Sequence, residues 1–138
     1  MEVTLYTRQN CPLCEKAKAT LVAAGVTPRE IDIDLDLDLL RRFGDDVPVI
    51  DINGNEAFRH RIEWRVVDGH HLEREFRFKN FADALAFTNK IGAVAESMNH
   101  HPDIELGWGR VRVTMWSHDA GKITAKDFAL AGAIDRAL

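Results

Sequence analysis

The chain has 138 residues, of which 46% are hydrophobic, so it can bury one good core or two small ones. Its formal net charge of −4 lies in residues 1–60, which hold 7 Lys and Arg against 11 Asp and Glu, while residues 61–138 hold 11 of each. No basic stripe is present, which argues against nucleic acid as a partner. The N-terminus has no charged leader before an apolar core, and no apolar run is of membrane-spanning length, so we expect a cytoplasmic protein without a membrane partner.

The first sixty residues alternate strand and helix. The expected elements are a strand at 3–6, a helix at 12–24, a strand at 31–34, a helix at 37–43, a strand at 47–50 and a hairpin turn at 52–55 into a fourth strand. Pro12 suits the first turn of a helix, Asp36 can cap the second helix, and Gly25 and Gly44 lie just past the two helix ends. The order β-α-β-α-β-β predicts a mainly parallel sheet.

The pattern changes after about residue 62. The expected elements are strands at 63–67 and 72–78 joined through Asp68-Gly69, a helix at 81–98, a strand at 108–116 and a last helix that runs from Thr124 toward Leu138. Asn80 can cap the long helix, and we expect Pro102 to end it because a residue before proline avoids helical geometry. The order β-β-α-β-α predicts an antiparallel sheet with helices on one face.

Cys11 and Cys14 are the only cysteines, so no disulfide framework is expected. The motif Cys-Pro-Leu-Cys follows a strand and opens a helix. A thiolate in that position is stabilised by unpaired backbone N–H groups, which lowers its pKa, and a second cysteine three residues on can resolve a mixed disulfide. Two cysteines without further clustered ligands are too few for a closed zinc site.

Residues 1–58 resemble a glutaredoxin-like, thioredoxin-fold segment that lacks the closing helix of that family. The likeness lies in the stretches "LYTRQNCPLC", "EIDIDLD" and "VPVI". The resemblance implies that Cys11 and Cys14 are redox residues and that Pro48 follows a cis peptide bond beside the thiols. Two interpretations stay open: a working thiol-disulfide oxidoreductase, or a retained scaffold whose cysteines no longer turn over a substrate.

Two adjacent histidine pairs stand in different contexts. His70-His71 follows a predicted turn and reads as a solvated surface pair. His100-His101 lies at the C-terminal end of the long helix, next to Pro102, and His118 follows the strand at 108–116. Three imidazoles brought together in one pocket would suit either a catalytic zinc ion or acid–base catalysis, and their spacing alone does not decide between the two.

Residues 59–138 resemble pterin-4a-carbinolamine dehydratase, without the N-terminal helix of that family. The matching pattern, which also includes the flanks "FRFKNFADALAFTNKIGAVAE" and "ITAKDFALAGAID", runs through Glu96, His100, His101, Pro102, Trp108, His118 and Asp127. The resemblance implies a lyase that dehydrates 4a-hydroxytetrahydrobiopterin to quinonoid dihydropterin. It also implies no metal, no cofactor, and a homo-oligomer that associates through helix 81–98. Ile104 departs from the family, which usually has an aromatic residue there.

The resemblance also assigns roles to single residues. His100 and His118 are the candidates for proton transfer, and His101 is expected mainly to orient the pterin. Among the substrate-binding candidates, Glu96 could bond an imidazole from one helical turn away, and Pro102 belongs to the same loop. Asp127 reads first as the capping-box partner of the last helix, and Trp108 would flank the pterin or fill the core. A non-catalytic dimerisation or binding module remains a further alternative for the whole chain.

Overall fold

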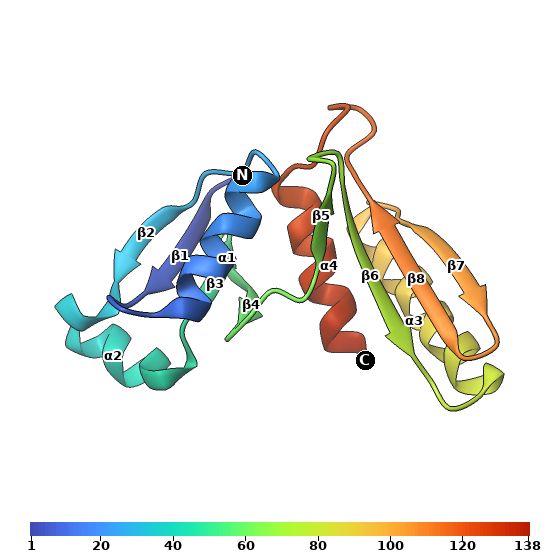
Figure 1. Cartoon of the computed structure of the whole chain (residues 1–138), viewed down its shortest axis with the longest axis horizontal. Helices are drawn as coiled ribbons and strands as arrows, with labels where there is room; N and C mark the ends of the chain where they lie inside the picture. The colour runs from blue at the N-terminus through green and yellow to red at the C-terminus, as the bar shows by residue number, and fades with distance from the viewer. The chain divides into compact units, whose positions relative to one another are not determined.

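The computed structural model describes all residues from 1 to 138, and they form two compact units. Unit 1 is Met1–Glu63 and unit 2 is Trp64–Leu138, whereas the sequence placed a boundary after residue 58. Both are mixed α/β structures (Figure 1). None of the helices combines the length and the apolar character that a membrane crossing needs.

Unit 1 is built on one four-stranded sheet. Its elements are β1 (Val3–Thr7), α1 (Pro12–Ala23), β2 (Arg29–Asp32), the 3-10 turn η1 (Ile33–Leu35), α2 (Leu37–Phe43), the 3-10 turn η2 (Gly44–Asp46), β3 (Val49–Ile52) and β4 (Asn55–Arg59). The strand order is β2-β1-β3-β4. Only β1 and β2 pair in parallel, whereas β3 runs antiparallel to both of its neighbours. The expectation of a mainly parallel sheet is therefore wrong, because β3 enters the sheet in the opposite direction.

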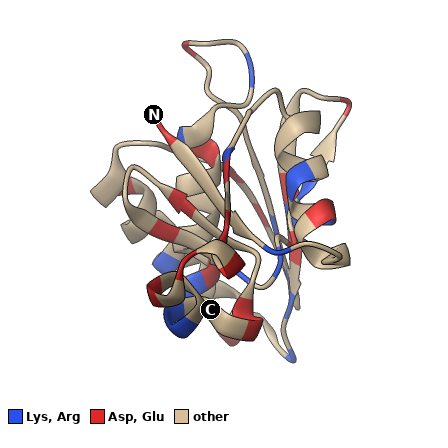
Figure 2. Cartoon of the chain, turned by 90° about the vertical axis from the view of Figure 1, so that its left-hand side faces the viewer, with Lys and Arg blue, Asp and Glu red and all other residues tan.

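Local sequence signals account for most boundaries in unit 1. Asp36 caps α2 by accepting the backbone N–H groups of Asp38 and Leu39, as its position predicted. The predicted strand at 31–34 is wrong in its second half, because the Asp32 carboxylate accepts the Asp34 N–H and turns the chain into η1. Figure 2 shows where acidic and basic residues lie along the chain. The helix α2 itself carries Asp38 in its first turn and two arginines in its last, and the adjoining η2 contains Asp45 and Asp46.

Unit 2 is an antiparallel sheet of order β5-β6-β8-β7. Its elements are β5 (Arg65–Val67), β6 (His71–Arg77), α3 (Phe81–Met98), β7 (Asp103–Gly107), β8 (Arg110–Met115) and α4 (Ala125–Ala137). The sequence missed β7, so the true order is β-β-α-β-β-α. The predicted strand at 108–116 is β8, and Trp108 lies in the turn before it. Since Ile104 and Leu106 alternate with acidic residues, the pattern of β7 was present but short.

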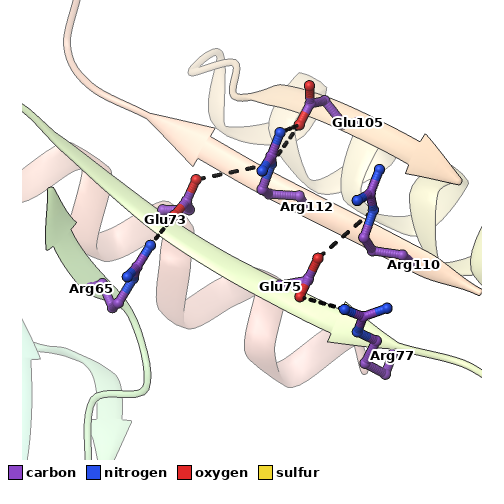
Figure 3. A network of polar contacts seen from close by, with 7 residues as sticks. All are labelled: Arg65, Glu73, Glu75, Arg77, Glu105, Arg110 and Arg112. Carbon is purple, nitrogen blue, oxygen red and sulfur yellow. Dashed lines mark hydrogen bonds and ion pairs between the residues drawn. The ribbon is translucent and has the colours of Figure 1, made fainter.

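The helices of unit 2 cover one face of the sheet, as predicted. Val111, Val113 and Met115 of β8 are buried. The opposite face carries a network of ion pairs between arginines and glutamates, most of them on neighbouring strands (Figure 3). Its members are Arg65, Glu73, Glu75, Arg77, Glu105, Arg110 and Arg112. Such exposed pairs add little stability each, about 0–1 kcal/mol.

The long helix α3 has one buried face and one exposed face. Ala84, Phe87, Ile91 and Ala95 are buried. The apolar residues Phe81, Leu85 and Met98 are 45%, 40% and 39% exposed, so they do not belong to the buried face.

Candidate functional site

The end of α3 delivers two histidines to the site. The helix stops at Asn99, whose backbone is left-handed (φ 49°) and whose N–H donates to the carbonyl of Ala95. Pro102 therefore does not end the helix, because the asparagine has already turned the chain three residues earlier. His100 and His101 leave the helix in a short segment that leads into β7.

His100 is held by a buried carboxylate. Its Nε2 lies 2.6 Å from Oδ1 of Asp127, a residue with no exposed surface. An ionised carboxylate only accepts hydrogen bonds, so Nε2 is the donor in this contact, and a neutral His100 ring then has its lone pair on Nδ1. The other oxygen, Oδ2, accepts the Thr124 N–H and the Ser117 hydroxyl, both at 2.8 Å. The capping-box prediction for Asp127 is confirmed, and the same carboxylate also fixes the His100 ring.

His101 is supported at the surface. Its Nε2 contacts Oε2 of Glu96, which lies five residues earlier on α3. The prediction that Glu96 bonds an imidazole is confirmed, and the imidazole is that of His101. Both side chains are more than half exposed, so water screens their attraction.

His118 rests on an aromatic ring that the sequence did not single out. The rings of His118 and Trp116 are stacked, with centroids 4.4 Å apart and planes 10° apart. The His70 ring lies 4.9 Å from Trp116, and Nδ1 of His70 lies 3.1 Å from Nδ1 of His71. His70 is exposed, as its turn sequence suggested, and it also contacts the Trp116 ring on which His118 stacks. Strand alternation held the only signal, since Trp116 follows the buried Met115 and must face the other way.

A cavity of about 370 Å³ lies where these elements meet. Its lining residues are Asn99, His100, His101, Pro102, Asp103, Trp116, His118 and Asp119. Three imidazoles thus converge on one cavity, as the sequence suggested. Glu96 and Asp127 hold histidines without lining it. Trp108 is 70% exposed and does not line it either, so the core interpretation of Trp108 is wrong. No group of three or more His, Cys, Asp or Glu side chains is arranged to hold a metal ion.

The thiol pair forms a second site, in unit 1. Cys11 and Cys14 are joined by a disulfide at the start of α1, and Sγ of Cys11 accepts the Cys14 N–H at 3.2 Å. Cys11 is partly exposed, whereas Cys14 is 3% exposed and belongs to a core cluster with Val47. The Val47-Pro48 peptide bond is cis, as the resemblance implied.

Two protein-family models match the chain. The model of pterin 4 alpha carbinolamine dehydratase matches residues 52–137. The model of the glutaredoxin-like domain (DUF836) matches residues 2–77. Each match covers more than half of the chain, and the two overlap around the junction of the two units.

Individual relatives point the same way. The chain is similar to two proteins named "Putative pterin-4-alpha-carbinolamine dehydratase". The one from Rubrobacter xylanophilus is 52% identical, and the match covers 53% of this chain and 68% of the relative. The one from Alkaliphilus metalliredigens is 49% identical, and the match covers 54% of this chain and 67% of the relative. Among solved structures, it resembles a transcriptional coactivator/pterin dehydratase from Brucella melitensis. That match has a TM-score of 0.52 and 32% identity, and it covers 54% of this chain and 81% of the other.

Proposed function

Because the chain belongs to the pterin 4 alpha carbinolamine dehydratase family and also carries a glutaredoxin-like domain, we propose that it dehydrates 4a-hydroxytetrahydrobiopterin to the quinonoid dihydropterin in tetrahydropterin recycling. The observation that carries this proposal is the convergence of His100, His101 and His118 on one cavity, each held by another side chain. The elimination of water needs a proton donor at the leaving hydroxyl and a proton acceptor at the ring nitrogen, and an imidazole side chain can serve in either role.

The elimination requires two proton transfers at separate points of the ring. The C4a–O bond breaks as an acid protonates the leaving hydroxyl, and a base removes the proton of the neighbouring ring nitrogen. His100 is the base, because its free Nδ1 can take a proton while the buried Asp127 carboxylate balances the charge that forms. His118 is the acid, because the stacked Trp116 ring can accommodate an imidazolium by cation–π attraction. His101, held by Glu96, orients the pterin from the open side of the cavity.

The test is a dehydratase assay on the full chain with a chelator present. Activity that survives chelation supports the metal-free mechanism. His100→Ala is expected to lower kcat by about 10²–10⁴-fold, the usual contribution of one acid or base. The matched control is His60→Asn, which replaces an exposed histidine of unit 1 and keeps a residue type that tolerates positive φ. Full activity in His100→Ala would remove the proposal.

We also propose that the chain forms a homo-oligomer through α3. The support is the exposed apolar set Phe81, Leu85 and Met98 on this helix. Leu85→Glu should then reduce the mass measured by light scattering to that of a smaller assembly, and an unchanged mass would place the contact elsewhere.

A second candidate function is thiol-disulfide exchange in unit 1. It is favoured by the Cys11–Cys14 disulfide at the start of α1, where the Cys14 N–H points at the sulfur of Cys11. Reductase activity toward a small disulfide that is lost in Cys11→Ser would support it. If neither His100→Ala nor Cys11→Ser changes any activity of the chain, a non-catalytic binding module becomes the better interpretation.

A further inference from the structure

We infer that the dithiol form of Cys11 and Cys14 reduces the quinonoid dihydropterin to the tetrahydropterin, so that one chain makes this product and consumes it. The inference rests on the proposed function of unit 2. A quinonoid dihydropterin lacks two electrons and two protons relative to the tetrahydropterin, and its consumption therefore requires a two-electron reductant. A dithiol that closes to a disulfide supplies two electrons and two protons, and unit 1 contains such a pair.

The two sulfurs are arranged for an attacking thiol and a resolving thiol. Cys11 is partly exposed and receives the Cys14 N–H at the first turn of α1, a position that stabilises a thiolate. Cys14 is 3% exposed and lies within bonding reach, with the two Cα atoms 5.2 Å apart. These positions favour Cys11 as the attacking thiol and Cys14 as the thiol that closes the disulfide.

A cavity of about 310 Å³ lies next to Cys14, and it suits a neutral ring better than an anionic disulfide. Cys11 does not line this cavity, but its sulfur is bonded to that of Cys14. Cys14 lines it, together with the carboxylates of Glu15, Glu30 and Asp32. The cations that line it are already paired: Arg8 lies 2.9 Å from Asp34, and Lys18 lies 3.0 Å from Glu30. The hydrogen bond to Asp34 also raises the pKa of Arg8.

The pyrimidine edge of a pterin presents a ring N–H and an amino group side by side, and a carboxylate accepts such a pair of donors. Asp32 is one candidate acceptor, because its Oδ1 accepts the Asp34 N–H at 2.9 Å and its Oδ2 has no hydrogen bond, whereas Glu30 is paired with Lys18. An anionic disulfide would instead meet an excess of carboxylates.

The step balances without a metal or flavin. The Cys11 thiolate adds to C4a, the atom that loses the hydroxyl during dehydration, and the neighbouring ring nitrogen takes a proton. The Cys14 thiolate then attacks Sγ of Cys11. The S–S bond forms, the C4a–S bond breaks, and its electron pair stays in the ring, where a second nitrogen takes a proton. The pterin is reduced, the dithiol is oxidised, and a small-molecule thiol resets the disulfide for the next turnover.

The experiment uses the reduced full-length chain and quinonoid dihydropterin prepared by chemical oxidation of the tetrahydropterin, mixed without oxygen. Tetrahydropterin is measured by chromatography and protein disulfide by alkylation and mass. We expect one disulfide per tetrahydropterin, formed at least about tenfold faster than with the same concentration of free dithiothreitol. Cys11→Ser should remove the acceleration. Asp32→Asn, which keeps a capping oxygen but loses the charge, should raise KM by about fivefold.

Because the quinonoid compound is supplied chemically, this test does not depend on the dehydratase. His100→Ala, which should abolish dehydration, is expected to retain full thiol-dependent reduction. A rate equal to that of free dithiothreitol, or one unaffected by Cys11→Ser, overturns the inference, as does loss of thiols without tetrahydropterin. A wild-type chain that reduces the quinonoid compound but cannot dehydrate the carbinolamine would instead refute the proposed function alone.

Discussion

Asp127→Asn tests whether one buried carboxylate both caps a helix and directs a catalytic histidine. The carboxylate accepts three hydrogen bonds, from His100, Ser117 and Thr124. Asparagine keeps the shape but has one acceptor oxygen. If that oxygen stays with Ser117 and Thr124, the amide NH₂ points at Nε2 of His100, which must then give up its proton. The proton moves to Nδ1, and the ring presents a donor to the cavity where a base is needed.

Two magnitudes follow from this geometry. Hydrogen bonds to a charged acceptor contribute about 1.5–3 kcal/mol each, against about 1 kcal/mol for neutral ones, and a helix cap contributes about 1 kcal/mol. We therefore expect Asp127→Asn to lower the free energy of unfolding by about 2–4 kcal/mol. The wrong tautomer of His100 should lower kcat by about 10²-fold or more.

Denaturant unfolding and steady-state dehydratase kinetics on the same samples separate the two effects. The matched control is Ser117→Ala, which removes one donor to Asp127 but leaves its charge and its bond to His100. We expect this variant to lose about 1 kcal/mol of stability and to keep kcat within about threefold of wild type. If Asp127→Asn also keeps wild-type kcat while it loses stability, the carboxylate is a helix cap only, and the assignment of His100 as the base is refuted.

Three further predictions concern other positions. Trp116→Thr should lower kcat by about 10–100-fold, because the His118 ring loses the aromatic ring on which it stacks. Trp116→Phe keeps an aromatic ring and should retain most of the activity, so an equal loss in both variants would refute a stacking role. Burial, and then the negative charge of the nearby Glu56, raise the pKa of Asp51 above its ordinary value of 3.8. At a pH above the folded-state pKa, the charged Asp51 therefore lowers the free energy of unfolding, whereas at a pH below the unfolded-state pKa the residue is neutral in both states and has no such effect. Asp51→Asn should therefore raise the thermal midpoint at pH 7, with a gain that vanishes as the pH falls below about 4. Gly109→Ala would place a Cβ 2.7 Å from the backbone oxygen of Phe78 and should lower the free energy of unfolding by about 1–3 kcal/mol. Gly92→Ala, with no atom within 4 Å of its Cβ, should instead stabilise its helix by up to about 1 kcal/mol. Equal effects of the two variants in denaturant unfolding would contradict the close approach at Gly109.

The features that the sequence predicted well are those controlled by near neighbours in the chain. The starts of α1, α2 and α4 follow from Pro12, Asp36 and Thr124, whose fixed φ angle or side-chain oxygen acts within three residues. The turn at Asp68-Gly69 follows from the positive φ angles that both residues adopt.

The errors lie where distant partners decide. The direction of β3 depends on β1 across the sheet, not on its own residues. The short strand β7 owes its existence to pairing with β8. Alternation after the buried Met115 gives the direction of Trp116, but not the His118 ring that stacks on it from beyond the strand. Asn99 was overlooked as the helix end because asparagine is a less frequent C-terminal cap than glycine.

The site depends on one junction in unit 2. The carboxylate of Asp127 joins three segments: His100, two residues after α3; Ser117, two residues after β8; and Thr124, the residue before α4. The orientation of the His100 ring therefore depends on the fold, since a change that loosens the start of α4 also weakens the Asp127 contact that holds this ring. Local opening of that first turn should therefore lower activity before global unfolding begins. Amide exchange at the first turn of α4, measured beside kcat over a temperature series, should show the two change together.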